Sequence, residues 1–315
     1  MKKGTIVAIV VAILLLLTGG VMLVLGLSFA EDATQSPKLT ERTVPITDPF
    51  TDLMVNTADC DVSVHLVSSW EEARVELAEH SQTKHQISME DGTLKIELTD
   101  HRRWFDQVGV FWEDMQVRVY LPMGEYAGMH IITATGDIEM PAYLTAQDVT
   151  LYSDTGDVYS EAQARYVSAE TDTGQIVVCA CNPEFVTAKS DAGDILLATM
   201  EGVKRCDATT TTGRIEVHNV ASETVECESE TGDVKLWLVK AERDLWISSD
   251  TGKVEIGNST AESLKVENDT GDIKIEESDA NSVDIESDTG SIRLPAAWKD
   301  RNGRIETDSG DIKFE

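Results

Sequence analysis

The sequence predicts an all-β protein, built mainly as a parallel β-solenoid (a β-helix) of about ten coils of 19–20 residues each. One observation is a glycine that recurs every 18 to 20 residues up to the last residues of the chain, at Gly136, Gly156, Gly174, Gly193, Gly213, Gly232, Gly252, Gly271, Gly290 and Gly310. A second is that apolar, mostly β-branched residues alternate with polar ones on both sides of this glycine, which is the period of a half-buried strand. So small a unit buries its apolar face only by stacking on its neighbours, about 4.8 Å apart. Each glycine is expected in a turn that needs a positive φ, as in type II turns.

Residues 1–30 predict a transmembrane anchor. Met1-Lys2-Lys3 precede an apolar run from Ile6 to Leu27, which as a helix is about 33 Å long, enough to span a bilayer. Because the lysines precede the run, the chain is expected to cross the cell membrane once, with its N-terminus in the cytoplasm and the solenoid outside. The alternative is a cleaved signal peptide, since Ser28-Phe29-Ala30 provides small residues for a cleavage site. Either way the solenoid is exported, and the polar residues 31–46 follow as a stalk.

Residues 47–130 carry less regular strand patterns and predict an irregular antiparallel cap, which merges into the repeats of residues 131–315. Within this cap, residues 101–115 concentrate aromatic and basic side chains in a chain that has few aromatics. One interpretation is a contact with a protein partner or with membrane headgroups, because Trp and Arg dominate binding hot spots. The other is an aromatic lid over the end of the solenoid. The candidate partner-binding residues are Arg102, Arg103, Trp104, Phe105, Phe111 and Trp112.

Two columns of hydroxyl residues precede the glycine, one three residues before it and one, mostly threonine, directly before it. Outward rows of this kind are a feature of ice-binding surfaces. However, both columns share the parity of the inward apolar columns, because side chains alternate with period two along a strand. The sequence therefore predicts two inward ladders, whose hydroxyls bond to the next coil or to turn backbone.

Two acidic columns lie two residues before and one residue after the glycine, and their parity predicts that they face water. Rows of carboxylates repel one another and suit Ca²⁺, which prefers several oxygen ligands. The alternative is that Asp is simply a favourable, solubilising turn residue. Calcium is the one cofactor that the sequence suggests. Its candidate ligands are Asp154, Asp157, Asp191, Asp194, Asp269, Asp272, Asp308 and Asp311.

Charge and motifs exclude several functions. A net charge of −31 argues against a nucleic-acid partner, because phosphate binding needs a basic surface. The odd number of five cysteines predicts no disulfide framework, and Cys206 and Cys227 fall in inward columns, where buried thiols are expected. The sequence has no metal motif, nucleophile elbow or phosphate loop. Because the coils leave no long loop to build a cleft, the chain is predicted not to be an enzyme.

The last repeat leaves an unpaired strand edge, which invites association with another chain. The charges of Lys313 and Glu315, and the segment 295–302 with Trp298, are expected to cover part of it. The alternative is an end-to-end homodimer.

The S-D-T-G-D-I-x-I repeats of 133–314, preceded by DGTLKIEL at 91–98 and VRVYLP at 117–122, resemble the bacterial putative-adhesin family with β-strand repeats, a domain of unknown function. The resemblance covers about residues 47–315 and implies a β-solenoid, anchored by one N-terminal helix, without catalytic residues. The expected function is a non-catalytic, membrane-tethered, extracytoplasmic binding or scaffold module of the bacterial cell envelope, with an envelope protein or glycan as its partner. Two alternatives are an accessory or sensor component of an envelope-stress response and a polysaccharide-active β-helix enzyme.

Overall fold

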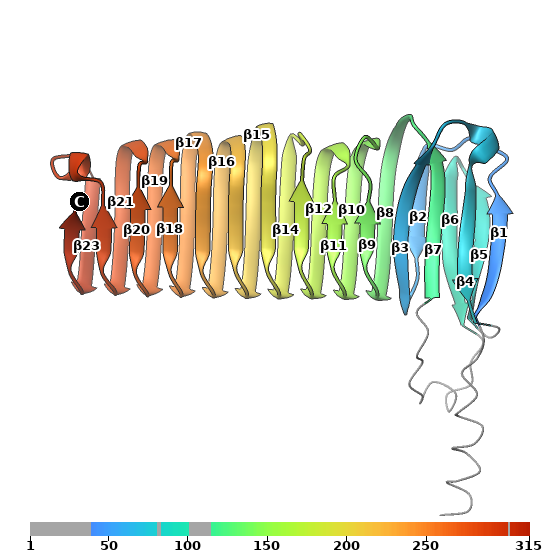
Figure 1. Cartoon of the computed structure of the whole chain (residues 1–315), viewed down its shortest axis with the longest axis horizontal. Helices are drawn as coiled ribbons and strands as arrows, with labels where there is room; N and C mark the ends of the chain where they lie inside the picture. Colours follow the sequence, from blue (N-terminus) through green and yellow to red (C-terminus); the bar gives the residue numbers. More distant parts are fainter. Residues whose placement is uncertain (1–38, 81–82, 101–114, 302) are drawn as a thin grey trace, which may run out of the picture.

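The structure is a computed structural model that describes residues 39–80, 83–100, 115–301 and 303–315. Within these residues, 24 strands form one continuous sheet, which is wound into a rod with the first seven strands at one end (Figure 1). Those seven strands, here called the cap, are β1 (Thr40–Pro45), β2 (Asp52–Asn56), β3 (Cys60–Val67), β4 (Arg74–Glu79), β5 (Thr83–Glu90), β6 (Thr93–Asp100) and β7 (Met115–Pro122). The short 3₁₀ helix η1 (Trp70–Glu72) precedes β4.

The remaining strands form the solenoid, which has about nine turns because ten marker glycines enclose nine intervals. These strands are β8 (Glu125–Thr135), β9 (Ile138–Met140), β10 (Thr145–Thr155), β11 (Val158–Ser160), β12 (Gln163–Thr173), β13 (Ile176–Cys179), β14 (Phe185–Ala192), β15 (Ile195–Thr212), β16 (Ile215–Thr231), β17 (Val234–Thr251), β18 (Val254–Gly257), β19 (Thr260–Thr270), β20 (Ile273–Glu276), β21 (Asp279–Thr289), β22 (Ile292–Leu294), β23 (Gly303–Ser309) and β24 (Ile312–Phe314). The 3₁₀ helix η2 (Ala296–Trp298) lies before β23.

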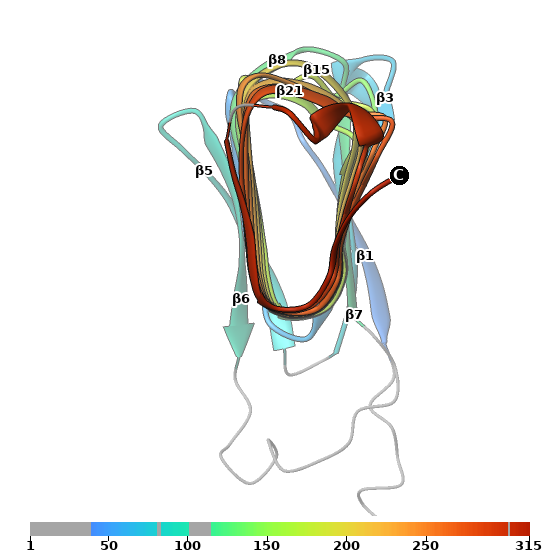
Figure 2. The same cartoon turned by 90° about the vertical axis from the view of Figure 1, so that its left-hand side faces the viewer.

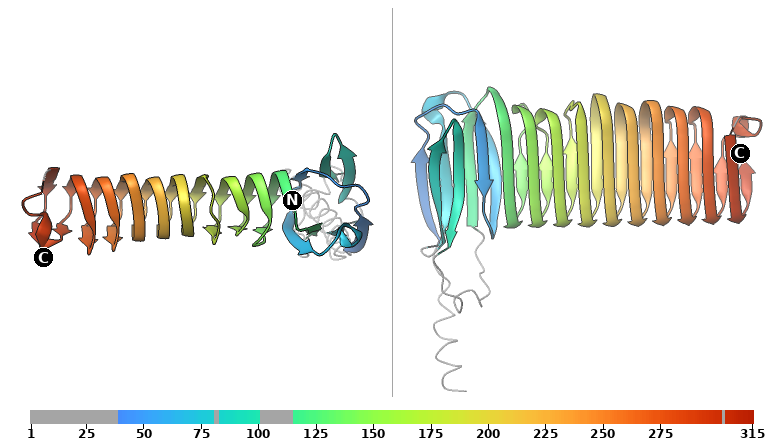
Figure 3. Two further views of the ribbon diagram at one scale, coloured as in Figure 1. Left: turned by 90° about the horizontal axis from the view of Figure 1, so that it is seen from above. Right: turned by 180° about the vertical axis from the view of Figure 1, so that it is seen from behind.

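Each solenoid coil consists of a long strand, the Thr-Gly turn, a second strand and a second turn. The coils stack in register: β10 pairs in parallel with β8 and β12, and β11 with β9 and β13. Viewed along the rod, the coils superpose as a narrow oval (Figure 2), and from above they form a straight row that ends in the broader cap (Figure 3). The predicted parallel β-solenoid is confirmed.

The alternating apolar residues fill the interior of the oval. In the coil of β10 and β11, for example, Val149, Leu151 and Val158 are at most 1% exposed. Cys206 and Cys227 lie in the same interior, as predicted, and all five cysteines are free. Burial raises the pKa of the Cys227 thiol to about 12, so this thiol stays protonated and packs as a small apolar group.

The column three residues before the glycine is the predicted inward ladder. The Ser153 hydroxyl is fully buried and donates to the Gly136 carbonyl of the preceding coil, at 2.9 Å. The same bond, from the hydroxyl of one coil to the glycine carbonyl of the coil before it, recurs for Thr171, Ser190, Thr210, Ser229, Ser249 and Thr307. Each such bond satisfies a carbonyl inside the rod, which matters because unpaired buried polar groups are costly.

The prediction that the threonines directly before the glycine also point inward is wrong. They form an exposed row, here called the threonine row: Thr135, Thr155, Thr173, Thr212, Thr231, Thr251, Thr270 and Thr289. The strand alternation stops at the buried hydroxyl, because the chain bends there into the turn. From that hydroxyl to the next inward residue, no side chain of the turn points into the core.

The marker glycines are required for a reason other than a type II turn. Gly213 has a φ of 154°, whereas the glycine of a type II turn has a φ near +80°. A Cβ atom on Gly213 would also lie 2.1 Å from the carbonyl oxygen of Gly193 in the preceding coil. Consecutive glycines are thus stacked so closely that each one leaves space only for another glycine.

The cap is mixed rather than purely antiparallel. The pairs β1–β4, β4–β7 and β5–β6 are antiparallel, whereas β2 and β3 pair in parallel with β8 and β9. On their other side, β2 and β3 pair in parallel with β6 and β7. The segment 52–67 is therefore an additional rung of the solenoid, inserted between two segments that follow it in the chain. The predicted irregular antiparallel cap is corrected accordingly: its strands pair in both directions.

This rung was not predicted because it lacks the glycine. Cys60 takes the place of the marker, and its carbonyl oxygen accepts a hydrogen bond from the Thr133 hydroxyl at 3.0 Å. Asp61 takes the place of the aspartate that follows the glycine, since its Oδ1 accepts the backbone N–H of Asp137 at 3.0 Å. A search for the glycine period alone therefore starts one rung too late.

At the far end, Trp298 of η2 is 1% exposed and covers the interior, as predicted for this segment, whereas Ile312 of β24 remains 38% exposed. The end-to-end homodimer stays a prediction. At the other end, the last residues of the predicted stalk form β1 instead. None of the residues that the structure describes form a helix long and apolar enough to cross a membrane. The predicted anchor, residues 1–30, lies outside the described residues.

Candidate binding surfaces

The aspartates directly after the glycines form a hydrogen-bonded row along the turn edge of the rod. Asp157 Oδ1 accepts the backbone N–H of Gln175 in the next coil at 2.7 Å, and Asp194 Oδ1 accepts that of Arg214 at 2.8 Å. Asp137, Asp233 and Asp272 make the same bond to the coil that follows. These carboxylates therefore link successive turns, which agrees with the interpretation of Asp as a turn residue.

The eight candidate calcium ligands are all exposed, as their parity predicts. Among the described residues, no three His, Cys, Asp or Glu side chains are grouped so that they could hold a metal ion. Several of these acids also have a protein partner: Asp157, Asp194 and Asp272 accept backbone N–H groups of the next coil, and a hydrogen bond with Asp154 raises the pKa of Tyr152 to about 12. The calcium rows remain a prediction.

The threonine row runs between the two acidic columns. Its members stack in register, for example Thr231 beside Thr251 and Thr251 beside Thr270. Because the row faces solvent, the parity argument against an ice-binding surface does not hold for it. The row is a single file of hydroxyls bordered by carboxylates on both sides, which is not a flat hydroxyl face.

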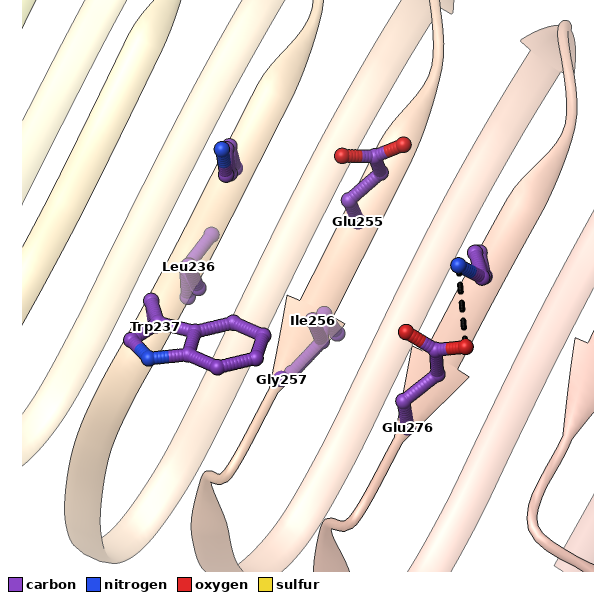
Figure 4. Close-up of a pocket in the computed structure, with 8 residues that line it drawn as sticks. Leu236, Trp237, Glu255, Ile256, Gly257 and Glu276 are labelled. Atoms are coloured by element: carbon purple, nitrogen blue, oxygen red, sulfur yellow. Dashed lines mark ion pairs between the residues drawn. The ribbon is translucent and has the colours of Figure 1, made fainter.

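A different surface feature lies on the strands that follow the turn. Trp237 of β17 is 37% exposed, and its indole extends over Gly257 of β18, its partner in the parallel ladder (Figure 4). The contact is so close that a Cβ atom on Gly257 would lie 1.9 Å from the indole Cζ3. Gly257 is buried although it lies on the outward side of the strand. The indole thus lies against the backbone of the next coil, with its outer side open to solvent.

Four charged residues, two lysines and two glutamates, line a small hollow beside this indole: Lys235, Glu255, Lys274 and Glu276. Lys274 and Glu276 form an ion pair at 2.9 Å (Figure 4), and the hydrogen bond that Lys274 donates to Glu276 raises the pKa of Lys274. The hollow between these side chains has a volume of only about 40 Å³, whereas pockets for small molecules measure about 300–1,000 Å³. We call Trp237, Gly257 and the four charged residues the tryptophan platform, because they offer a surface rather than a cavity.

Leu238 extends the apolar surface beside Trp237. It is 46% exposed and has a φ of 58°, in the left-handed region. The same positive φ recurs at this turn position in other coils, at Ala180, Thr199, Asn219, Asn258 and Glu277, so it belongs to the second turn of the repeat and not to Leu238 alone.

The comparison with protein families identifies the chain. The family model described as Toastrack DUF4097 matches residues 50–246 and 220–315. The chain belongs to the Toastrack DUF4097 family. The family resemblance deduced from the sequence is therefore confirmed, and the function of the family is unknown.

Several solved structures match most of this Toastrack chain at low identity and low TM-score. A putative adhesin from Bacteroides fragilis is 14% identical with a TM-score of 0.32, and covers 89% of this chain and 98% of its own. A putative adhesin from Parabacteroides merdae is 11% identical with a TM-score of 0.33, covering 88% and 97%. A putative lipid binding protein from Parabacteroides distasonis is 11% identical with a TM-score of 0.36, covering 88% and 97%. No curated protein matches the chain.

The Toastrack cap holds a buried polar network that sequence reasoning missed. Glu79 accepts the backbone N–H of His85 at 2.9 Å, and the same oxygen lies 3.2 Å from His85 Nδ1. His85 Nε2 lies 2.8 Å from the Thr57 hydroxyl, and Arg42 donates to Glu79 from its Nε at 3.2 Å. Burial lowers the pKa of His85, although its hydrogen bond to the Glu79 carboxylate opposes that shift. No short motif could reveal this network, because its members come from four segments of the chain.

The order carboxylate–imidazole–hydroxyl in this network is also the order of an acid–base–nucleophile triad. However, His85 is 3% and Thr57 is 6% exposed, so a substrate cannot reach the hydroxyl without opening the cap. The arrangement instead satisfies the buried polar groups of the cap.

The candidate partner-binding residues Arg102, Arg103, Trp104, Phe105, Phe111 and Trp112 lie outside the described residues.

Proposed function

We propose that the chain is a non-catalytic, adhesin-like binding or scaffold module of the bacterial cell envelope, which presents one long regular surface to a protein or glycan partner. The observation that carries this proposal is the continuous parallel pairing of successive coils from β8 to β24, in register on both sides of the Thr-Gly turn. Such stacking repeats the same outward positions at every coil, and extended repeat surfaces of this kind serve as binding surfaces.

Three features support a binding role over catalysis. The coils differ by at most two residues in length and provide no long loop for a cleft. The hollow beside Trp237 is too small to enclose a substrate. The one acid–base–hydroxyl arrangement noted in the described residues, that of Glu79, His85 and Thr57, is buried.

The tether and the location are part of the proposal. The apolar run from Ile6 to Leu27, with two lysines before it, supports a single membrane-spanning segment with the rod outside the cytoplasm. The net charge of −31 supports a neutral or cationic partner, because polyanions such as nucleic acids are repelled.

The test uses the full chain, solubilised in detergent and immobilised, and measures binding of two fractions by surface plasmon resonance. One fraction is detergent-solubilised envelope protein and the other is lipid-free envelope glycan. We expect saturable binding of one fraction, competed by free chain and lost in Gly213→Val, which disrupts the stacking. Absence of saturable binding to both fractions, or release of smaller products from the glycan, would contradict the proposal.

A further inference from the structure

The glycine beneath Trp237 is there to accommodate the indole. Gly257 is not among the glycines with a positive φ, so its backbone conformation does not call for glycine. A glycine in a strand weakens the strand and often marks a place where another group approaches closely. The group that approaches Gly257 is the Trp237 ring, which a Cβ atom would displace. Glycine at this strand position therefore allows the indole to lie flat against the surface of the rod.

A flat, exposed indole suits one kind of ligand surface. Large planar aromatic side chains contribute binding energy by covering apolar area. A pyranose ring offers a matching surface, because the C–H groups on one side of the ring are apolar while its hydroxyls project at the edge. A hydroxyl at the ring edge can both donate and accept hydrogen bonds, so it needs partners of both kinds beside the aromatic face.

The four charged residues that line the hollow beside the indole provide those partners. The ammonium groups of Lys235 and Lys274 donate hydrogen bonds, whereas the carboxylates of Glu255 and Glu276 accept them. Their charges also cancel, two against two, within a chain that carries −31 overall. A locally neutral, polar rim is complementary to an uncharged ligand rather than to a polyanion or a polycation.

The shape of the surface also limits the size of the ligand. The hollow of about 40 Å³ cannot enclose a ligand, and the strands on either side of Trp237 continue without a wall. A ligand therefore lies across the platform and extends beyond it. Leu238, exposed directly after Trp237, lengthens the apolar strip on which it lies.

We propose that the tryptophan platform binds a neutral polysaccharide, with one uncharged pyranose ring stacked on Trp237 and its hydroxyls bonded to the lysines and glutamates beside it. This inference rests on the proposed function, of which it names the ligand class and the site.

The test measures binding of three neutral hexasaccharides, cellohexaose, maltohexaose and chitohexaose, to the detergent-solubilised full chain by isothermal titration calorimetry. Three variants accompany the wild type. Trp237→Ala removes the ring, and Gly257→Ala keeps every binding group but forces the ring off its place. Tyr166→Ala is the matched control, because Tyr166 is an aromatic residue of similar exposure, 39%, in a different coil.

We expect at least one hexasaccharide to bind, with an affinity about tenfold or more weaker in both Trp237→Ala and Gly257→Ala and unchanged in Tyr166→Ala, at an unchanged melting temperature. Failure of all three sugars to bind would overturn the inference, as would binding that Trp237→Ala leaves intact. The surface plasmon resonance test with envelope fractions separates the two proposals. If Trp237→Ala binds envelope protein or glycan as strongly as the wild type does, the proposed function stands and this site assignment is wrong. If the wild type retains neither, the proposed function itself fails.

Discussion

In both the solenoid and the cap, a sheet closes around an apolar interior, but the strands are paired differently in the two regions. In the solenoid, each coil pairs with the coil that follows it in the chain, so one local rule is repeated. In the cap, β2 lies between β6 and β8, and β3 between β7 and β9, so the pairing depends on contacts distant in sequence. The solenoid is therefore built by repetition and the cap by single, specific contacts.

The interior polar groups show the same contrast. In the solenoid, a serine or threonine in almost every coil donates to the glycine carbonyl of the coil before it, at distances such as 2.9 Å for Ser153 and 3.0 Å for Thr171. In the cap, one network of Arg42, Glu79, His85 and Thr57 serves a similar purpose without any repetition. Damage to one solenoid bond should thus cost little, whereas damage to the cap network should cost much more. Only the glycine stack within the solenoid should be as sensitive.

The largest effect is expected at the glycine stack. Gly213→Val places a Cβ where the Gly193 carbonyl oxygen lies, 2.1 Å away, and we expect a loss of about 4 kcal/mol or more in the free energy of unfolding, measured by denaturant titration. The control is Gly202→Ala in β15, the strand that precedes this turn, where φ is 70° but no atom lies within 4 Å of the added Cβ. There we expect a loss of only about 1 kcal/mol, from backbone strain alone. Equal losses would show that φ, not stacking, accounts for the glycines.

The second effect concerns the cap network. Glu79→Ala removes the acceptor of the Arg42 Nε and of the backbone N–H of His85, and we expect a loss of about 3 kcal/mol in the free energy of unfolding, measured in the same way. The control is Glu76→Ala on the same strand, which breaks a surface ion pair with Arg74 at 2.7 Å. That change should cost less than about 1 kcal/mol. Similar losses for the two variants would mean that the buried network contributes no more than a surface pair.

A third prediction uses pH to separate the cap from the solenoid. Because burial lowers the pKa of His85 in the folded state, the unfolded state binds the proton more readily. The contribution of neutral His85 is complete above the unfolded pKa of about 6.5 and is lost as the pH falls below it towards the folded pKa. The melting temperature of the wild type should therefore fall more between pH 7.5 and pH 5.5 than that of His85→Gln. Parallel curves for the two proteins would remove His85 from the explanation.

The smallest predicted effect is a gain in stability, at Asn268. Asn268 replaces the ladder hydroxyl in its coil, and its Nδ2 donates both to Gly252 and to Gly271, at 3.2 and 2.8 Å. Within the described residues, the buried Ser287 hydroxyl then has no partner. Asn268→Ser frees the Gly271 carbonyl for Ser287, and we expect a gain of about 1 kcal/mol in the free energy of unfolding. The reverse change in another coil, Ser249→Asn, should lose a similar amount, and a gain there would contradict the ladder rule.

The repeated features of the molecule could be predicted from its sequence, and the single ones could not. The stacking of coils and the inward bonds of Ser153 and its equivalents follow from period and parity. The outward threonine row was missed because strand alternation ends at the turn, and the rung of Cys60 was missed because it lacks the marker glycine. The contact of Trp237 with Gly257 depends on which residues of two coils stand side by side, so it emerges only once the register is known.

The central claim, that successive coils lie directly over one another in register, is tested most directly by distances between spin labels on the threonine row. With one label at position 155 and the other at 212, 251 or 289, the labels are separated by three, five or seven coils. Double electron–electron resonance should then give distances that grow linearly, by about 4.8 Å per coil, to about 34 Å for the last pair. Distances that do not grow in proportion to the number of coils would contradict the stacked solenoid.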